Sequence, residues 1–181
     1  ILQISSYVFP LITFPYLTRV LGPDKFGIFV FANATMVYFQ LLVDFGFTLS
    51  ATKDCSIHRE NTVKLSEVVS VVTQAKIALF TLGLIILLLL SFTVEAFSDK
   101  RTFLLLFYIP VFLSIFIPDY FFRGIEKMGA LTYRTIVTKG MFTVMTFVVI
   151  RSPDDYMYIP VLNTIGNIVV LGLIWYVLMT K

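Results

Sequence analysis

Long runs of apolar residues alternate with short polar connections along most of this chain. Uncharged runs cover residues 1–18, 26–43, 77–94, 102–118 and 156–180, and residues 130–150 are interrupted only by Arg134 and Lys139. A membrane-spanning helix needs about 20 mostly apolar residues. We therefore predict an all-α, polytopic integral membrane protein with six transmembrane helices, at about residues 1–20, 26–51, 66–94, 102–122, 130–150 and 156–180.

The connections between these helices are short. Residues 22–25, Gly-Pro-Asp-Lys, form a tight turn in this prediction, because Gly, Pro and Asp favour turns. Residues 53–66 form the one substantial polar loop. Short hairpins make successive helices antiparallel neighbours, so the six helices are expected to pack as one bundle.

Composition supports a membrane protein and excludes several other classes. Hydrophobic residues make up 58% of the 181 residues and charged residues only 14%, whereas soluble domains carry about a quarter charged residues. The basic residues are scattered singly, so no nucleic-acid patch forms. One cysteine, Cys55, and one histidine, His58, build no disulfide or metal cluster, and no phosphate loop is present. We expect no cofactor and no metal.

Lysine and arginine are distributed unevenly between the two sides of the predicted bundle. Seven lie on the side of the 53–66 loop and five on the other side. Cytoplasmic loops carry the excess of such residues. The count favours a cytoplasmic N-terminus and a cytoplasmic 53–66 loop. Because residue 1 already lies in an apolar run, we interpret the chain as part of a longer protein.

Polar residues recur on one face of several predicted helices. Spacings of three, four or seven keep side chains on one face of a helix. The polar positions on such faces include Asn33, Gln40, Asp44, Lys76, Thr135, Lys139, Asn163 and Asn167. Such residues either hydrogen-bond their own backbone and join helix to helix, or line a shared aqueous cavity. Their recurrence on several helices favours the cavity.

Charged residues inside the predicted helices strengthen this interpretation. A lysine or aspartate at the centre of a membrane helix costs about 2.5–3.5 kcal/mol on insertion scales and usually faces a cavity or a partner. Lys76 and Lys139 each lie roughly 15 Å from one end of their helix. The alternative is that they extend to the headgroups. Arg19, Arg134 and Asp44 lie nearer helix ends, where local pairing would suffice. Asp119 and Arg123 have the spacing of an ion pair on one helix.

Prolines interrupt helices that must cross the membrane. A proline inside a helix removes a backbone hydrogen bond and bends the axis. Pro10 and Pro15 on the first helix and Pro118 on the fourth are suited to bends that gate a cavity. Static kinks without motion are the alternative interpretation.

Three segments of the chain resemble a known family. The segments are PYLTRVLGPDKFGIFVFA (15–32), DFGFTLSATKDCSIHREN (44–61) and PDYFFRGIEKM (118–128). In order and spacing they are similar to signatures of bacterial polysaccharide flippases, the Wzx-type O-antigen exporters of the multidrug/oligosaccharidyl-lipid/polysaccharide superfamily. In the third segment, Tyr120 and Arg123 stand where members often carry Trp and Gln.

The resemblance implies a fold and a function. Proteins of this kind have about twelve to fourteen helices in two lobes of six, of which residues 1–181 would be the N-terminal lobe. They move undecaprenyl-pyrophosphate-linked oligosaccharide from the cytoplasmic to the periplasmic leaflet of the bacterial inner membrane. The implied partners are membrane lipid, the C-terminal lobe, a polysaccharide polymerase and a chain-length regulator, and no nucleic acid. We expect Arg19, Lys76 and Lys139 to supply the cations of the lumen, with Asp44 as counter-ion or proton site.

Two other functions compete with this interpretation. A cation-coupled multidrug extruder of the same superfamily would need buried carboxylates, and here the cations inside the predicted membrane helices outnumber the carboxylates. A membrane-embedded polysaccharide polymerase or acyltransferase would need a large extracytoplasmic loop or a catalytic His or Asp. Neither of these appears in the chain.

Overall fold

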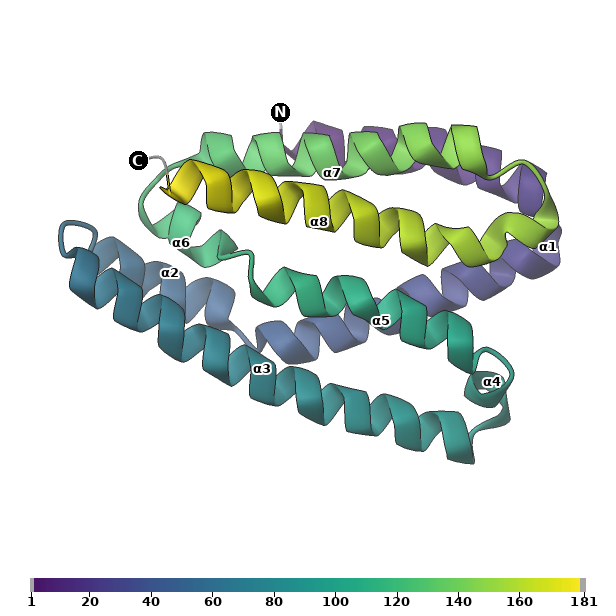
Figure 1. Ribbon diagram of the computed structural model, residues 1–181, viewed down its shortest axis with the longest axis horizontal. Helices are drawn as coiled ribbons and strands as arrows, with labels where there is room; N and C mark the ends of the chain where they lie inside the picture. The colour runs from purple at the N-terminus through teal and green to yellow at the C-terminus, as the bar shows by residue number, and fades with distance from the viewer. Residues whose placement is uncertain (1, 180–181) are drawn as a thin grey trace.

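Every element in the described part of the chain is helical. The computed structural model describes the backbone of residues 2–179 and the side chains of residues 7–129 and 131–175 (Figure 1). The elements are α1 (Leu2–Asp44), α2 (Phe47–Ile57), α3 (Thr62–Thr93), α4 (Glu95–Ser98), α5 (Arg101–Ile115), α6 (Asp119–Gly124), α7 (Met128–Val149), the 3-10 helix η1 (Pro153–Met157) and α8 (Tyr158–Met179).

The long helices form one bundle with their axes along its length. In Figure 1, α8 lies between α7 and α5, and it packs against both. The first part of α1 packs behind α7, and its second part runs back toward α3 and α5. In Figure 1, α3 and α5 run in opposite directions, as do α7 and α8, in agreement with the short loops, whereas α2 continues the course of α1 and α6 that of α5.

Helix α1 contains a reversal of direction at Gly22. The backbone there has φ 70° and ψ 173°, outside the helical region, and helix resumes at Pro23. Proline suits the first turn of a helix because its missing N–H would have no partner there. Phe14 of the first arm meets Phe26 and Phe29 of the second arm edge-to-face, with ring centroids 6.2 and 5.9 Å apart. The predicted turn is confirmed, and the helix continues through Pro10 and Pro15.

Two predicted helices are each broken into two. The helix predicted for 26–51 ends at Asp44, where Phe45 and Gly46 take left-handed backbone angles, and α2 begins at Phe47. The helix predicted for 102–122 ends at Ile115, and α6 begins at Asp119 after Pro118. The hydrophobicity of the sequence did not predict either helix end, because apolar residues occur within the helices and also at the two breaks.

The predicted polar loop at 53–66 is mostly helical, so that prediction was wrong. Only residues 58–61 separate α2 from α3, and the side chain of Asn61 caps α3 by accepting a hydrogen bond from the Lys64 N–H at 3.1 Å. Tertiary packing holds these helix ends in place. Their buried cluster contains Ala51, Cys55, Leu65, Val72 and Tyr120.

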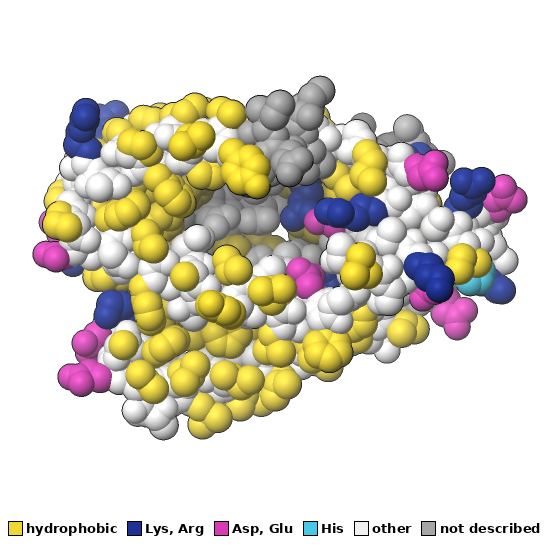
Figure 2. All heavy atoms as spheres, turned by 180° about the vertical axis from the view of Figure 1, so that it is seen from behind, with side chains coloured by type: hydrophobic (Ala, Val, Ile, Leu, Met, Phe, Trp, Pro, Cys, Tyr) yellow, Lys and Arg dark blue, Asp and Glu magenta, His cyan; other side chains and the backbone are white. Residues whose placement is uncertain are grey.

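The outer surface of the bundle is apolar. Leu49, Val63 and Phe92 are each more than 70% exposed, and Figure 2 shows apolar side chains over much of one face. Within the described residues, four helical stretches are long and apolar enough to cross a membrane: Tyr7–Ile57, Thr62–Thr93, Arg101–Gly124 and Pro153–Trp175. The first of these contains both arms of α1. The predicted all-α polytopic membrane fold is confirmed.

Helix α7 is more polar than those four stretches, yet it packs against α1 and α8 in the bundle. Arg134, Lys139 and its threonines lower its hydropathy. Thr143 meets Thr13 of α1 with 3.0 Å between the hydroxyl oxygens. Thr143 therefore serves a contact between α7 and α1 inside the bundle.

Opposite ends of α3 should be reachable from opposite sides of the membrane. At 1.5 Å per residue, its 32 residues span about 48 Å, more than the hydrocarbon core. We expect single cysteines at Asn61 and at Ser98, both exposed positions, to react with an impermeant maleimide from the cytoplasm and the periplasm respectively. The background is the full-length protein with the buried Cys55 replaced. Labelling of both positions from one side would contradict this topology.

Candidate functional site

A polar hollow lies inside the apolar bundle. Figure 2 shows it in the middle of one face, with basic and acidic side chains at its margin. One part of it, which we name the charged cavity, measures about 370 Å³. Its polar lining residues are Asn33, Gln40, Asp44, Thr48, Lys76, Ser114, Asp119, Tyr120, Arg134, Asn163 and Asn167.

Asp44 and Lys76 form an ion pair in the charged cavity. Nζ of Lys76 donates to Oδ1 of Asp44 at 2.7 Å, and the two side chains are 6% and 32% exposed respectively. Nε2 of Gln40 donates to Oδ2 of Asp44 at 3.0 Å and also contacts the Ser114 hydroxyl at 3.1 Å. A buried ammonium is stable only when it is paired and hydrogen-bonded. This network joins α1, α3 and α5 and holds the lysine in place.

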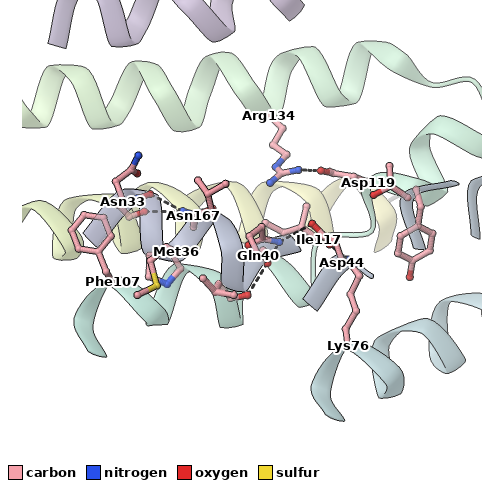
Figure 3. Close-up of a pocket in the computed structure, with 17 residues that line it drawn as sticks. Asn33, Met36, Gln40, Asp44, Lys76, Phe107, Ile117, Asp119, Arg134 and Asn167 are labelled. Atoms are coloured by element: carbon pink, nitrogen blue, oxygen red, sulfur yellow. Dashed lines mark hydrogen bonds and ion pairs between the residues drawn. The ribbon is translucent and has the colours of Figure 1, made fainter. Parts of the chain in front are cut away.

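Asp119 and Arg134 form a second ion pair, between α6 and α7. Figure 3 shows the Arg134 side chain extending from α7 toward Asp119. Within the described residues, Oδ1 of Asp119 is buried and accepts no hydrogen bond. A guanidinium has five N–H donors in a planar fork, so one carboxylate oxygen does not use them all. Arg134 therefore keeps donors for an anion in the cavity.

Both carboxylates lie beside a break in a helix. Asp44 is the last residue of α1, and Asp119 is the first residue of α6. Residues at a helix end have backbone groups without intrahelical partners, which makes these positions more polar than a helix interior. The breaks thus place charge inside an otherwise apolar bundle.

A second cavity of about 380 Å³, which we name the aromatic cavity, adjoins the charged cavity. It is lined by Phe9, Pro10, Thr13, Phe14, Phe29, Asn33, Thr138, Lys139, Phe142, Thr143, Asn163 and Asn167. Three of these residues, Asn33, Asn163 and Asn167, also line the charged cavity. The three amides therefore lie where the two cavities meet.

Most of the residues that we predicted for the lumen line one of these two cavities. Asn33, Gln40, Asp44, Lys76, Asn163 and Asn167 line the charged cavity, and Lys139 lines the aromatic cavity. Pro10 lines the aromatic cavity, whereas Pro15 is exposed and the buried Pro118 caps α6.

Arg19 and Thr135 line neither cavity. Arg19 is exposed, because its neighbours Leu17 and Leu21 face the core and residues two apart point to opposite sides of a helix. The hydroxyl of Thr135 donates to the Leu131 carbonyl at 2.9 Å, in its own helix. A lumen role for Arg19 and Thr135 stays a prediction, and both residues lie outside the two cavities.

Arg134, Asp119 and Ser114 line the charged cavity, although we did not predict them for the lumen. The spacing allowed Asp119 to pair with Arg123 on one helix, but Asp119 pairs with Arg134 on the next helix. One feature of the sequence could have indicated this ion pair. Asp119 and Arg134 carry opposite charges and lie on either side of the short connection between α6 and α7. Within the described residues, no group of three or more His, Cys, Asp or Glu could hold a metal ion.

The whole chain, residues 1–181, matches the family described as polysaccharide biosynthesis protein. The chain belongs to this family. It is 32% identical over 170 residues to an Escherichia coli K12 protein named "Putative O-antigen transporter" and 26% identical over 151 residues to a Shigella dysenteriae protein of the same name. These alignments cover 93% and 83% of the chain, and the predicted polysaccharide family is confirmed.

This family member spans about two fifths of the length of those relatives, at 41% and 38%. No solved structure matches it. Its long apolar helices indicate a multi-pass membrane protein. Its family assigns it to polysaccharide biosynthesis.

Proposed function

We propose that this chain forms one lobe of an exporter for lipid-linked oligosaccharide. The substrate is an oligosaccharide carried on undecaprenyl pyrophosphate, moved from the cytoplasmic to the periplasmic leaflet of the bacterial inner membrane. A C-terminal lobe completes the transport path, and the polymerase and chain-length regulator act on the exported product. Family membership and the names of the relatives support the substrate class.

The observation that carries this proposal is the polar hollow inside an apolar bundle. A lipid-linked oligosaccharide has an anionic pyrophosphate, hydroxyl-rich sugars and a hydrocarbon tail. The hollow offers cations at Lys76, Arg134 and Lys139 and amides at Asn33 and Gln40. The outer surface is apolar, so the tail can remain in the bilayer while the head group crosses.

The ion pairs favour an anionic substrate over an organic cation. An extruder of cations needs a carboxylate available to its substrate. Asp44 and Asp119, the two carboxylates that line the charged cavity, are paired with Lys76 and Arg134. An assay of the purified full-length protein distinguishes the enzyme alternatives. A polymerase would extend polysaccharide and an acyltransferase would transfer an acyl group, whereas an exporter moves the lipid-linked oligosaccharide between leaflets.

Loss of the cavity lysines is expected to reduce export. The test uses a flippase-deleted strain that carries the full-length protein with Lys139→Gln, alone and combined with the neutral pair Asp44→Asn/Lys76→Gln. Replacing the pair together avoids leaving a carboxylate unpaired. Hydrogen bonds to charged groups contribute about 1.5–3 kcal/mol, so we expect surface polysaccharide to fall about tenfold or more at matched membrane levels.

Lys64→Gln is the matched control, because Lys64 is an exposed lysine on α3. Lys139→Arg keeps the charge and should restore part of the export, although its planar fork is not equivalent to an ammonium. Normal surface polysaccharide in the combined variant would rule out a binding role for these lysines.

The prolines of α1 are expected to act in gating. Each proline leaves one backbone carbonyl without its helical partner, which makes a helix easier to bend. Pro10→Ala combined with Pro15→Ala should leave the membrane level of the full-length protein normal and slow export in the same strain. Degraded protein whose inserted fraction exports at the normal rate would show that the prolines serve assembly.

A further inference from the structure

The aromatic cavity combines two kinds of side chain that fit a sugar. Phe9, Phe14, Phe29 and Phe142 line it, together with the amides of Asn33, Asn163 and Asn167. A sugar ring presents C–H bonds on its faces and hydroxyls around its edge. Aromatic rings pack against the faces, and an amide both donates to and accepts from hydroxyls. Its volume of about 380 Å³ lies in the range of about 300–1,000 Å³ that is usual for small-molecule sites.

The reversal at Gly22 builds this cavity from both arms of α1. Phe9 and Phe14 come from the first arm, and Phe29 and Asn33 from the second. The Thr13–Thr143 hydrogen bond of 3.0 Å ties the first arm to α7, and Thr13 is 2% exposed. The cavity wall is therefore held by packing before any ligand binds.

The amides differ in how far they are already engaged. Nδ2 of Asn167 donates to the backbone carbonyl and to Oδ1 of Asn163, at 2.9 and 3.0 Å. The Asn33 side chain is exposed toward the hollow and forms no hydrogen bond with another residue in the described part of the chain. Asn33 thus has its full capacity of donors and acceptors for a ligand.

The ion pairs lie at the other end of the hollow. Figure 3 shows Asn33 and Asn167 at one end of the charged cavity and Asp44, Lys76, Asp119 and Arg134 toward the other. The two ion pairs therefore lie at one end of the hollow, and the aromatic and amide side chains of the aromatic cavity lie at the other end. The head group of the proposed substrate is arranged in the same way, with the anionic pyrophosphate at one end and the uncharged hydroxyls and C–H faces of the sugars beyond it.

We propose that the aromatic cavity is the sugar subsite, in which Asn33 and Phe142 distinguish the oligosaccharide, while the charged cavity takes the pyrophosphate. This inference rests on the proposed function. It assigns sugar specificity to a part of the hollow that excludes both ion pairs. Lys139 adds an ammonium to the subsite. An ammonium donates hydrogen bonds to sugar hydroxyls and balances the charge of an acidic sugar.

The test compares two substrates for each variant. The full-length protein is reconstituted in vesicles with undecaprenyl pyrophosphate that carries either the complete repeat unit or only its first sugar, and movement between leaflets is timed. Asn33→Ala and Phe142→Leu should slow the complete unit about tenfold and the single-sugar lipid less than about twofold, because only the longer head group reaches the subsite. The pair Asp119→Asn/Arg134→Gln should slow both substrates alike.

Leu41→Ala, at an exposed position on the same arm of α1 as Asn33, is the matched control and should change neither rate. Equal slowing of both substrates by Asn33→Ala and Phe142→Leu, or no slowing of either, would overturn the sugar subsite and leave the exporter proposal standing. Failure of the unmodified protein to move either lipid would overturn the exporter proposal, and the subsite with it.

Discussion

Replacing Lys76 with methionine is expected to destabilise the folded chain strongly. Methionine keeps the length of the side chain but leaves the Asp44 carboxylate, 2.7 Å from the ammonium in the native protein, without its counter-ion. Removing one partner of a buried ion pair costs about 3–5 kcal/mol. Since the Asp44 side chain is 32% exposed, we expect the lower end of that range. Thermal unfolding of the purified full-length protein in detergent measures the change.

The double variant Asp44→Asn/Lys76→Met should regain most of this stability. It has no unpaired charge, and the amide that replaces the carboxylate of Asp44 can still bond to Gln40, whose Nε2 lies 3.0 Å from Oδ2 of Asp44 in the native protein. Lys64→Met, at an exposed position on the same helix, is the control for loss of a lysine and should unfold like the native protein. A double variant as unstable as Lys76→Met would mean that the lysine stabilises the bundle through contacts other than this ion pair.

Replacing Gly22 with alanine is expected to impair folding of the first helical hairpin. Its φ of 70° with ψ of 173° lies in a region that is essentially restricted to glycine. Such strain costs about 1–3 kcal/mol if the backbone keeps its course. If the turn shifts instead, the ring contacts of Phe14 with Phe26 and Phe29 are lost. We expect a lower membrane yield and a lower unfolding temperature of the full-length protein.

Gly27→Ala is the matched control for the hairpin. Gly27 lies on the helical second arm of α1, five residues beyond Gly22, and a Cβ there would meet no atom within 4 Å. Alanine is favoured over glycine in a helix by about 1 kcal/mol, so this variant should be as stable as the native protein or more stable. Equal behaviour of the two variants would contradict the role of Gly22 in the turn.

The amino-acid sequence by itself determined that this is a helical membrane protein and where its chain reverses. Apolar runs of about 20 residues require helices in a bilayer, since each backbone polar group must be satisfied within its own segment. Gly22 followed by Pro23 marks the reversal, because only glycine tolerates that backbone and proline suits a helix start. Helical spacing also placed Asn33, Gln40 and Asp44 on one face, and all three line the charged cavity.

Only the tertiary structure decided which charges pair and how the hollow divides. Asp44 and Lys76 are 32 residues apart, and Asp119 pairs with Arg134 and not with Arg123. Such partners depend on how helices pack, and spacing within one helix carries no information about packing between helices. From the sequence we predicted one helix over residues 26–51 and, at Pro118, a bend within a continuous helix, whereas the structure ends α1 at Asp44 and begins α6 at Asp119. The aromatic cavity needs both arms of α1 against α7 and α8, so its aromatic and amide residues gather only in the folded bundle.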